Sequence, residues 1–172
     1  MKRQERAKAW KKRQAQDVLF QSRHHDYRTP PELFNALDAE FHFTLDVAAD
    51  AENTLCAEYY DKQIDALTQD WEGVCFLNPP FGERGPASQT ERSRRFGLWL
   101  KKAAESAKTG ATVVALIPAR TDTHWFHDHV LPHAELRFIR GRQRFPRPGD
   151  IKTKSATFPS IIAIYRPARR DP

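Results

Sequence analysis

The chain has 172 residues, a hydrophobic fraction of 40% and a formal net charge of +6. This length and composition are those of a single globular domain with one core. No apolar run is as long as a membrane span, and the charged N-terminus lacks the apolar stretch of a secretory signal. Its two cysteines, Cys56 and Cys75, make neither a disulfide framework nor a zinc site, so we expect a cytoplasmic protein without a membrane partner.

The charges are arranged in three blocks. Residues 1–28 carry a net charge of +6, residues 29–77 carry −10, and residues 78–172 carry +10. Basic flanks suit a polyanion such as nucleic acid, whereas an acidic middle suits a cationic small molecule. Any one block is typical of a solvated surface, but the alternation of three favours the functional interpretation.

The first segment, residues 2–19, has a weak apolar stripe among many basic residues, which is typical of a helix lying along DNA or of a frayed tail. We therefore divide the chain into a basic N-terminal extension, residues 1–26, and one domain, residues 27–172.

A helix start follows this extension. Thr29 is predicted as the N-cap and Pro30 as the first helical residue, and Leu33, Phe34 and Leu37 then form an apolar face.

Residues 41–48 predict the first strand, with Asp46 at its carboxyl end. Only 31 residues separate Asp46 from Asn78, which is short for a crossover with a full helix and strand. We therefore expect an abbreviated segment over residues 50–65, with a short helical turn and a brief strand or loop at residues 57–60.

The run Val74 to Leu77 is apolar without alternation and predicts a buried parallel strand. Asn78, Pro79, Pro80 and Phe81 follow it directly. Prolines cannot continue a central strand, so the chain leaves the sheet here with a locked backbone. In open α/β sheets, ligands bind at the carboxyl ends of strands.

The residues at this corner suit a planar ring that bears an amino group. The Asn78 side-chain carbonyl and the Pro79 backbone carbonyl are two acceptors for an exocyclic NH2, and Phe81 offers an aromatic face for stacking. The alternative is a turn that only ends a strand and has no catalytic role.

The remaining elements alternate between helix and strand. Residues 82–95 predict a mobile loop over the site, and Ser93 is predicted to cap a helix that ends at Gly110. Thr121 begins another helix, which carries several histidines, but we expect no metal because no thiolate joins them. Further strands are predicted over residues 112–117, 134–139 and 158–165.

A basic loop is predicted between the last two strands, over residues 140–157. It contains one acid, Asp150, and it is the best candidate for DNA contacts, although a solvated charge run remains the alternative. With the arginines of the loop over residues 82–95, the candidate DNA-binding residues are Arg140, Arg142, Arg144, Arg147, Lys152, Lys154, Arg94 and Arg95.

The Asn78–Phe81 tetrapeptide is similar to the (Asp/Asn/Ser)-Pro-Pro-(Tyr/Phe/Trp) motif of amino-methyltransferases. Together with the segments 27–30, 43–49, 65–67, 70–71, 116–121 and 138–142, in this order, the chain resembles the phage-type adenine-N6 DNA methyltransferases (Dam-like) over residues 27–165. The resemblance implies a Rossmann-like α/β fold with a mostly parallel sheet flanked by helices, and S-adenosylmethionine as the cofactor.

The resemblance also implies which residues bind the cofactor. Thr29 and Pro30 would meet its methionine end, Asp46 its ammonium, and Asp65 and Leu67 its adenine. Ala48, two residues after Asp46, stands where the family has a glycine-rich pattern. Alanine still permits a close approach of the backbone to the cofactor, but a less close one than glycine does.

The expected function is methylation of adenine N6 in double-stranded DNA, with the target base flipped out of the duplex. The catalytic site would be formed by Asn78, Pro79, Pro80 and Phe81. The resemblance also implies that the protein is encoded by a phage or prophage and acts in the cytoplasm of a bacterial host. Two alternatives stay open. The first is methylation of cytosine N4, an RNA adenine or a protein glutamine, and the second is a non-catalytic nucleic-acid-binding protein.

Overall fold

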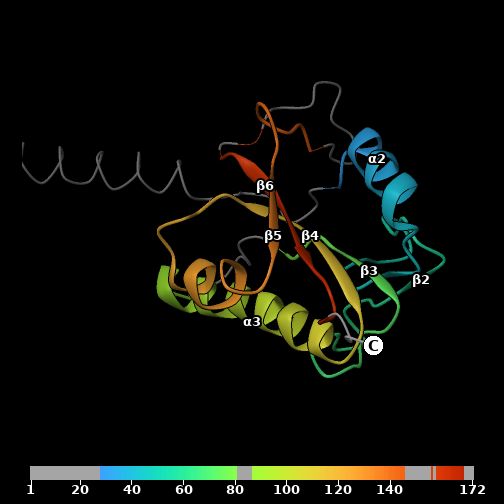
Figure 1. The fold of residues 1–172 in the computed structure, drawn as a ribbon, viewed down its shortest axis with the longest axis horizontal. Coiled ribbons are helices and arrows are strands. Elements are labelled where there is room, and N and C mark those ends of the chain that lie inside the picture. The colour runs from blue at the N-terminus through green and yellow to red at the C-terminus, as the bar shows by residue number, and fades with distance from the viewer. Residues whose placement is uncertain (1–27, 81–86, 146–155, 157, 169–172) are drawn as a thin grey trace, which may run out of the picture.

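In the computed structural model, one sheet lies between two helices (Figure 1). The structure describes residues 28–80, 87–145, 156 and 158–168. The predicted N-terminal extension, Phe81 and most of the basic loop lie outside these residues. The described elements are α2 (Pro31–Phe41), β1 (Leu45–Asp46), β2 (Glu58–Tyr59), β3 (Val74–Leu77), α3 (Gln89–Lys108), β4 (Thr112–Pro118), the π-helix η1 (Phe126–Val130), β5 (Glu135–Phe138) and β6 (Ser160–Tyr165).

The sheet is mixed. In the described part of the chain it has six strands in the order β2-β1-β3-β4-β6-β5. The pairs β1–β2, β1–β3 and β3–β4 are parallel, whereas β6 runs antiparallel to both of its neighbours, β4 and β5. The sequence predicted a mostly parallel sheet. An apolar run does not indicate the direction of its strand, and β6 runs opposite to its neighbours.

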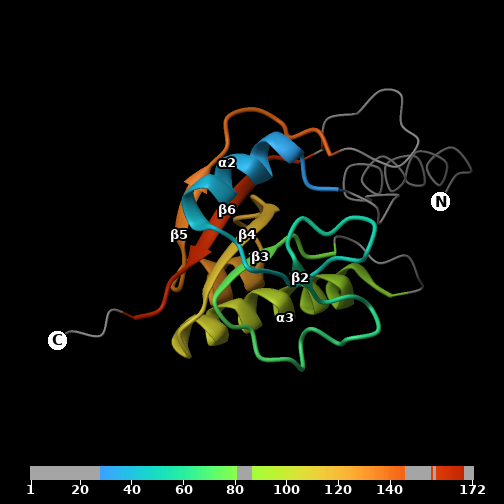
Figure 2. The same cartoon turned by 90° about the vertical axis from the view of Figure 1, so that its right-hand side faces the viewer.

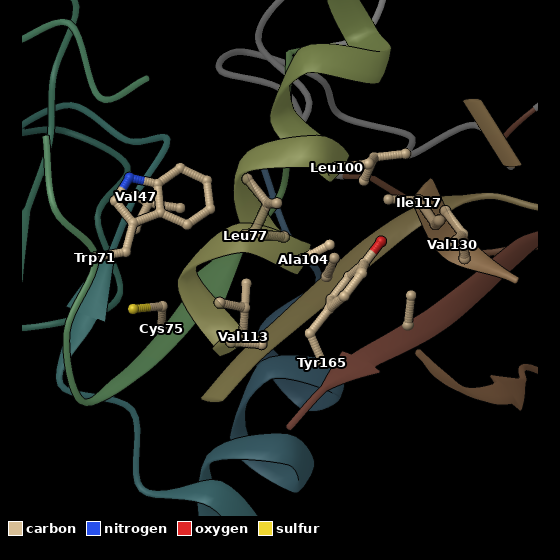
Figure 3. Packing of buried hydrophobic residues seen from close by; sticks show 14 of the residues in the cluster. Val47, Trp71, Cys75, Leu77, Leu100, Ala104, Val113, Ile117, Val130 and Tyr165 are labelled. Carbon is tan, nitrogen blue, oxygen red and sulfur yellow. The ribbon is translucent and has the colours of Figure 1, made fainter. Parts of the chain in front are cut away.

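Alternation along the strands divides the core into two layers. Cys75 and Leu77 of β3 face α3, in a cluster that includes Leu100, whereas Phe76 faces α2 and packs with Phe34. Figure 2 shows α2 and α3 on opposite sides of the sheet. In Figure 3, Trp71, Leu77, Ala104 and Tyr165 come together in the α3 layer. The small residues on α3, among them Ala103, Ala104 and Ala107, let the helix backbone approach the strands closely.

The predicted strand over residues 41–48 is wrong at its start. Phe41 is the last residue of α2, and His42 ends the helix in the left-handed conformation with φ 56°. Its N–H donates to the Asp38 carbonyl at 2.8 Å, and the Phe43 N–H donates to Asp38 Oδ1 at 2.8 Å. The apolar alternation at Phe41, Phe43 and Leu45 imitates a strand, but Phe41 belongs to the helix and Phe43 packs against the same buried cluster.

Two predicted helix starts are also wrong. Pro30, not Thr29, is the N-cap of α2, and Pro31 is the first helical residue. Ser88, not Ser93, caps α3, where its side chain accepts from the Glu91 N–H at 3.1 Å. Residues 89–95, predicted as part of a mobile loop, are therefore helical.

The helix start predicted at Thr121 is wrong as well, because residues 121–123 form a turn and a bend before the helical residues that end at Val130. The other element predictions hold. The strand at residues 74–77 is confirmed, and the predicted strands over 112–117, 134–139 and 158–165 correspond to β4, β5 and β6 with shifts of one or two residues at their ends. The connection from β1 to β3 is abbreviated as expected, because residues 47–73 contain no helix. A turn at Asp50, where the Thr54 N–H donates to the Asp50 carbonyl at 2.9 Å, and the two-residue strand β2 take its place.

We expect Gly73→Ala to destabilise the fold more than Gly141→Ala. Both glycines have positive φ, +68° and +81°, where a side chain costs about 1–2 kcal/mol. Only at Gly73 would the new Cβ also meet an atom, Thr44 Oγ1 at 2.8 Å, and that hydroxyl bonds both backbone groups of Val74. Urea unfolding of the two variants should show the larger loss for Gly73→Ala, and equal losses would contradict the tight packing before β3.

Candidate active site

Two neighbouring parallel strands bring the predicted site residues to one edge of the sheet. Asp46, the last residue of β1, pairs with Phe76 of β3, and the Val47 N–H donates to the Phe76 carbonyl at 3.1 Å. Asn78 therefore lies just beyond the end of β3, two residues past the partner of Asp46. This edge is where the carboxyl ends of β1, β3 and β4 meet.

Asn78 is half-buried, and its side chain is held by a residue that is distant in the sequence. Its Nδ2 donates to Thr29 Oγ1 at 3.0 Å, across 49 positions of sequence. Thr29 is 7% exposed, and Pro79 is buried whereas Pro80 is exposed. The predicted stacking residue, Phe81, lies outside the described residues.

Asp46 is a buried acid at the end of β1. Its residue is 4% exposed, and burial raises the pKa of its carboxyl to about 6. The Ala48 N–H donates to Oδ1 at 3.3 Å and the backbone of Leu55 also stabilises the ionised form, while the nearby charge of Asp50 opposes it. Within the described part of the chain, no basic side chain is among the groups that set this pKa. The site therefore has a buried anion that a cationic ligand would stabilise.

The remaining predicted cofactor residues are less closely connected. Pro30 is buried, and its carbonyl accepts from the Phe34 N–H at 3.0 Å in the first turn of α2. Ala48 packs against the core beside β1. Asp65 is exposed, and its Oδ1 accepts from the Leu67 N–H at 3.2 Å, so its hydrogen bonds are local to its turn.

The turn that carries Asp65 and Leu67 is anchored from beneath by a buried tryptophan. Trp71 is 2% exposed, and its indole N–H donates to the Ala66 carbonyl at 2.8 Å. The structure thus fixes the conformation of this turn.

The predicted DNA-binding residues fall into two groups. Arg140, Arg142 and Arg144 are exposed in the segment after β5, whereas Arg147, Lys152 and Lys154 lie outside the described residues. Arg94 and Arg95 both pair with Glu91 on α3, at 3.0 Å and 3.1 Å, and these arginines hold the pKa of Glu91 at about 2. One acid thus offsets part of their charge.

The sequence interpretation gave no role to Arg120, which follows β4 at this same edge. The residue is half-buried, and burial lowers the pKa of its guanidinium, while Asp122 raises it. Its carbonyl accepts from Thr123 Oγ1 at 2.8 Å, which fixes the turn. The signal was available, since Arg120 comes just after a buried strand that ends in Pro118, much as Asn78 comes after β3.

Two negative findings concern the described residues alone. They contain no group of three or more His, Cys, Asp or Glu side chains that could hold a metal ion. They also contain no helix that is both long and apolar enough to cross a membrane. One of the histidines that follow Thr121, His127, has its ring nitrogen 2.7 Å from the Thr121 carbonyl.

Comparison with known proteins gives one consistent result. The family model described as DNA N-6-adenine-methyltransferase (Dam) matches residues 17–171. A DNA N-6-adenine-methyltransferase of Haemophilus phage HP1 is 26% identical over 82% of this chain and 78% of its own length. A protein of the same name from Escherichia phage T1 is 28% identical over 66% of this chain, but the match spans only 44% of the phage protein. The chain belongs to the DNA N-6-adenine-methyltransferase (Dam) family.

Proposed function

We propose that this protein transfers a methyl group from S-adenosylmethionine to N6 of adenine in double-stranded DNA, within a Rossmann-like methyltransferase fold. The observation that carries the proposal is the position of Asn78, held by Thr29 at the end of β3 beside the buried Asp46 of β1. Membership of the family supports the reaction. The phage relatives support a place of action in the cytoplasm of a bacterial host.

The chemistry of Asp46 fits this cofactor. S-adenosylmethionine carries an ammonium and a sulfonium, and it supplies the methyl group bound to that sulfonium. A buried carboxylate at the end of β1, within the acidic segment 29–77, offers the anion that the ammonium requires. Thr29, Pro30, Ala48, Asp65 and Leu67 complete the proposed cofactor site on the strength of the family resemblance.

Asn78 would act on the nitrogen that receives the methyl group. The lone pair of the adenine amino group is delocalised into the ring, so this nitrogen is a weak nucleophile. When Asn78 Oδ1 and the Pro79 carbonyl accept hydrogen bonds from the NH2, they stabilise the positive charge that develops there during transfer. Asn78 is neutral and is not a strong base, so the proton leaves to water.

The target adenine has to leave the duplex, because its amino nitrogen is otherwise inaccessible to the site. Phe81 would stack on the flipped ring. Backbone phosphates would be bound by Arg140, Arg142, Arg144, Arg147, Lys152 and Lys154. Arg94 and Arg95 are weaker candidates for this role, because both already pair with Glu91.

We expect Asn78→Ala to lower methyl transfer by about 100-fold or more, because a donor–acceptor contact to developing charge is lost. The measurement is the rate at which tritium passes from labelled cofactor into unmethylated duplex DNA, with cofactor affinity followed by calorimetry. Lys108→Ala is the matched control, since this exposed residue ends α3 at the opposite edge of the sheet. Undiminished transfer by Asn78→Ala would contradict the proposed mechanism.

Cofactor affinity should rise as the pH increases from about 5 to about 7, because the carboxylate of Asp46 ionises in this range while the cofactor ammonium stays charged. Asp46→Asn should flatten this dependence and weaken binding. Calorimetric titrations of both proteins across the pH range test this, and a parallel pH dependence would remove Asp46 from the ammonium site.

In the protein without cofactor, Asp46 gives the free energy of unfolding a pH dependence of the opposite sign to that of cofactor affinity. Because the folded-state pKa of Asp46 is raised, the folded state holds more protons than the unfolded chain between about pH 4 and pH 6. The contribution of this group to the free energy of unfolding therefore falls as the pH rises through that window, by on the order of 2–3 kcal/mol. Asp46→Asn should remove this fall in urea unfolding without cofactor.

Replacing Arg142, Arg144 and Arg147 by Ala should weaken DNA binding and flatten its salt dependence. Each lost phosphate contact lowers the slope of log K against log salt by about 0.9. Lys101→Ala with Lys108→Ala is the control, since both lysines are exposed on α3. Fluorescence anisotropy with duplex DNA at several salt concentrations measures the slope, and an unchanged slope in the triple variant would exclude this segment from the interface.

A further inference from the structure

The side chain of Asn78 has two chemically different ends, and only one suits the proposed reaction. Its carbonyl oxygen accepts hydrogen bonds, whereas its NH2 only donates. A substrate amino group presents donors, so the oxygen has to face the substrate. A half-turn of the amide would set the NH2 of Asn78 against the NH2 of the base and would remove the stabilising contact.

In the structure, the nitrogen end of the Asn78 amide is the end that faces Thr29. Asn78 Nδ2 donates to Thr29 Oγ1 at 3.0 Å, which leaves Oδ1 at the other end of the amide. Thr29 is 7% exposed, and a partner shielded from water holds its hydrogen bond better than an exposed one.

Thr29 is itself held firmly relative to β3. The next residue, Pro30, has a φ fixed by its ring and is the N-cap of α2, where its carbonyl accepts from the Phe34 N–H at 3.0 Å. Phe34 then packs edge-on against Phe76 of β3, with ring centroids 5.1 Å apart. The two ends of the Asn78–Thr29 hydrogen bond are thus joined a second time, through the packing of α2 on the strand that leads to Asn78.

We propose that Thr29 is a positioning residue whose hydroxyl orients the Asn78 amide so that Oδ1 accepts from the amino group to be methylated. This inference rests on the proposed function and adds to it, since Thr29 then acts on the transfer step as well as lining the cofactor site. Thr29→Val keeps the shape of the side chain but removes the acceptor, and Thr29→Ser keeps the acceptor.

The kinetic test is single-turnover methyl transfer at saturating cofactor and DNA. Thr29→Val should lower the transfer rate by about 10- to 100-fold, as expected for a misoriented reacting group, with cofactor affinity changed much less. Thr29→Ser should retain most of the rate. Two results would overturn the proposal. One is an unchanged rate in Thr29→Val. The other is a loss of rate that accompanies an equal loss of cofactor affinity and disappears at saturating cofactor.

A second measurement tests the hydrogen bond without any activity. In proton–nitrogen NMR spectra, the Asn78 side-chain NH2, assigned as the pair of signals missing from Asn78→Ala, should exchange faster with water in Thr29→Val than in Thr29→Ser. If the wild-type protein transferred no methyl group but the two variants differed in this way, the proposed function would fail while the orienting contact stood. Equal exchange in the two variants would overturn the orienting role, whatever the reaction.

Discussion

The parallel pairing of β1 with β3 determines the candidate site. These strands are only two and four residues long, yet their register sets Asp46 opposite Phe76 and so brings an acid and the Asn-Pro-Pro corner to the same edge. Both strands are buried, and β3 is packed from both sides, by α3 against Leu77 and by α2 against Phe76. A shift of one residue in this register would turn Leu77 and Phe76 to the wrong layers and would separate Asp46 from Asn78.

The site combines two polar groups with different requirements. Asp46 is buried with a raised pKa, so without a cation its ionised form destabilises the fold. Asn78 is neutral, and its cost of burial is met in part by Thr29. This combination fits a reaction in which a cationic methyl donor is held by one strand and a neutral amino group is held by the next. The reaction needs no strong base in such a site, because the acceptors act on charge that develops at the substrate nitrogen.

Much of the site could be predicted from local sequence, because its signals are local. The apolar run Val74–Leu77 ending in two prolines gave the strand and its end, and the short spacing from Asp46 gave an abbreviated connection without a helix. Long-range features could not be predicted in this way. The sequence Thr-Pro-Pro-Glu is compatible with a helix start at either proline, and the true partner of Thr29 is 49 positions away. The reversed direction of β6 has no local signature either, because a buried strand is apolar whichever way it runs.

The most direct test of the central claim is the identity of the modified nucleoside. Unmethylated duplex DNA would be incubated with the protein and S-adenosylmethionine, digested to nucleosides and analysed by mass spectrometry, with single-stranded RNA treated in parallel. The proposed function predicts N6-methyladenine in the DNA. N4-methylcytosine, methylation of the RNA alone, or an unmodified substrate despite measurable cofactor binding would contradict it.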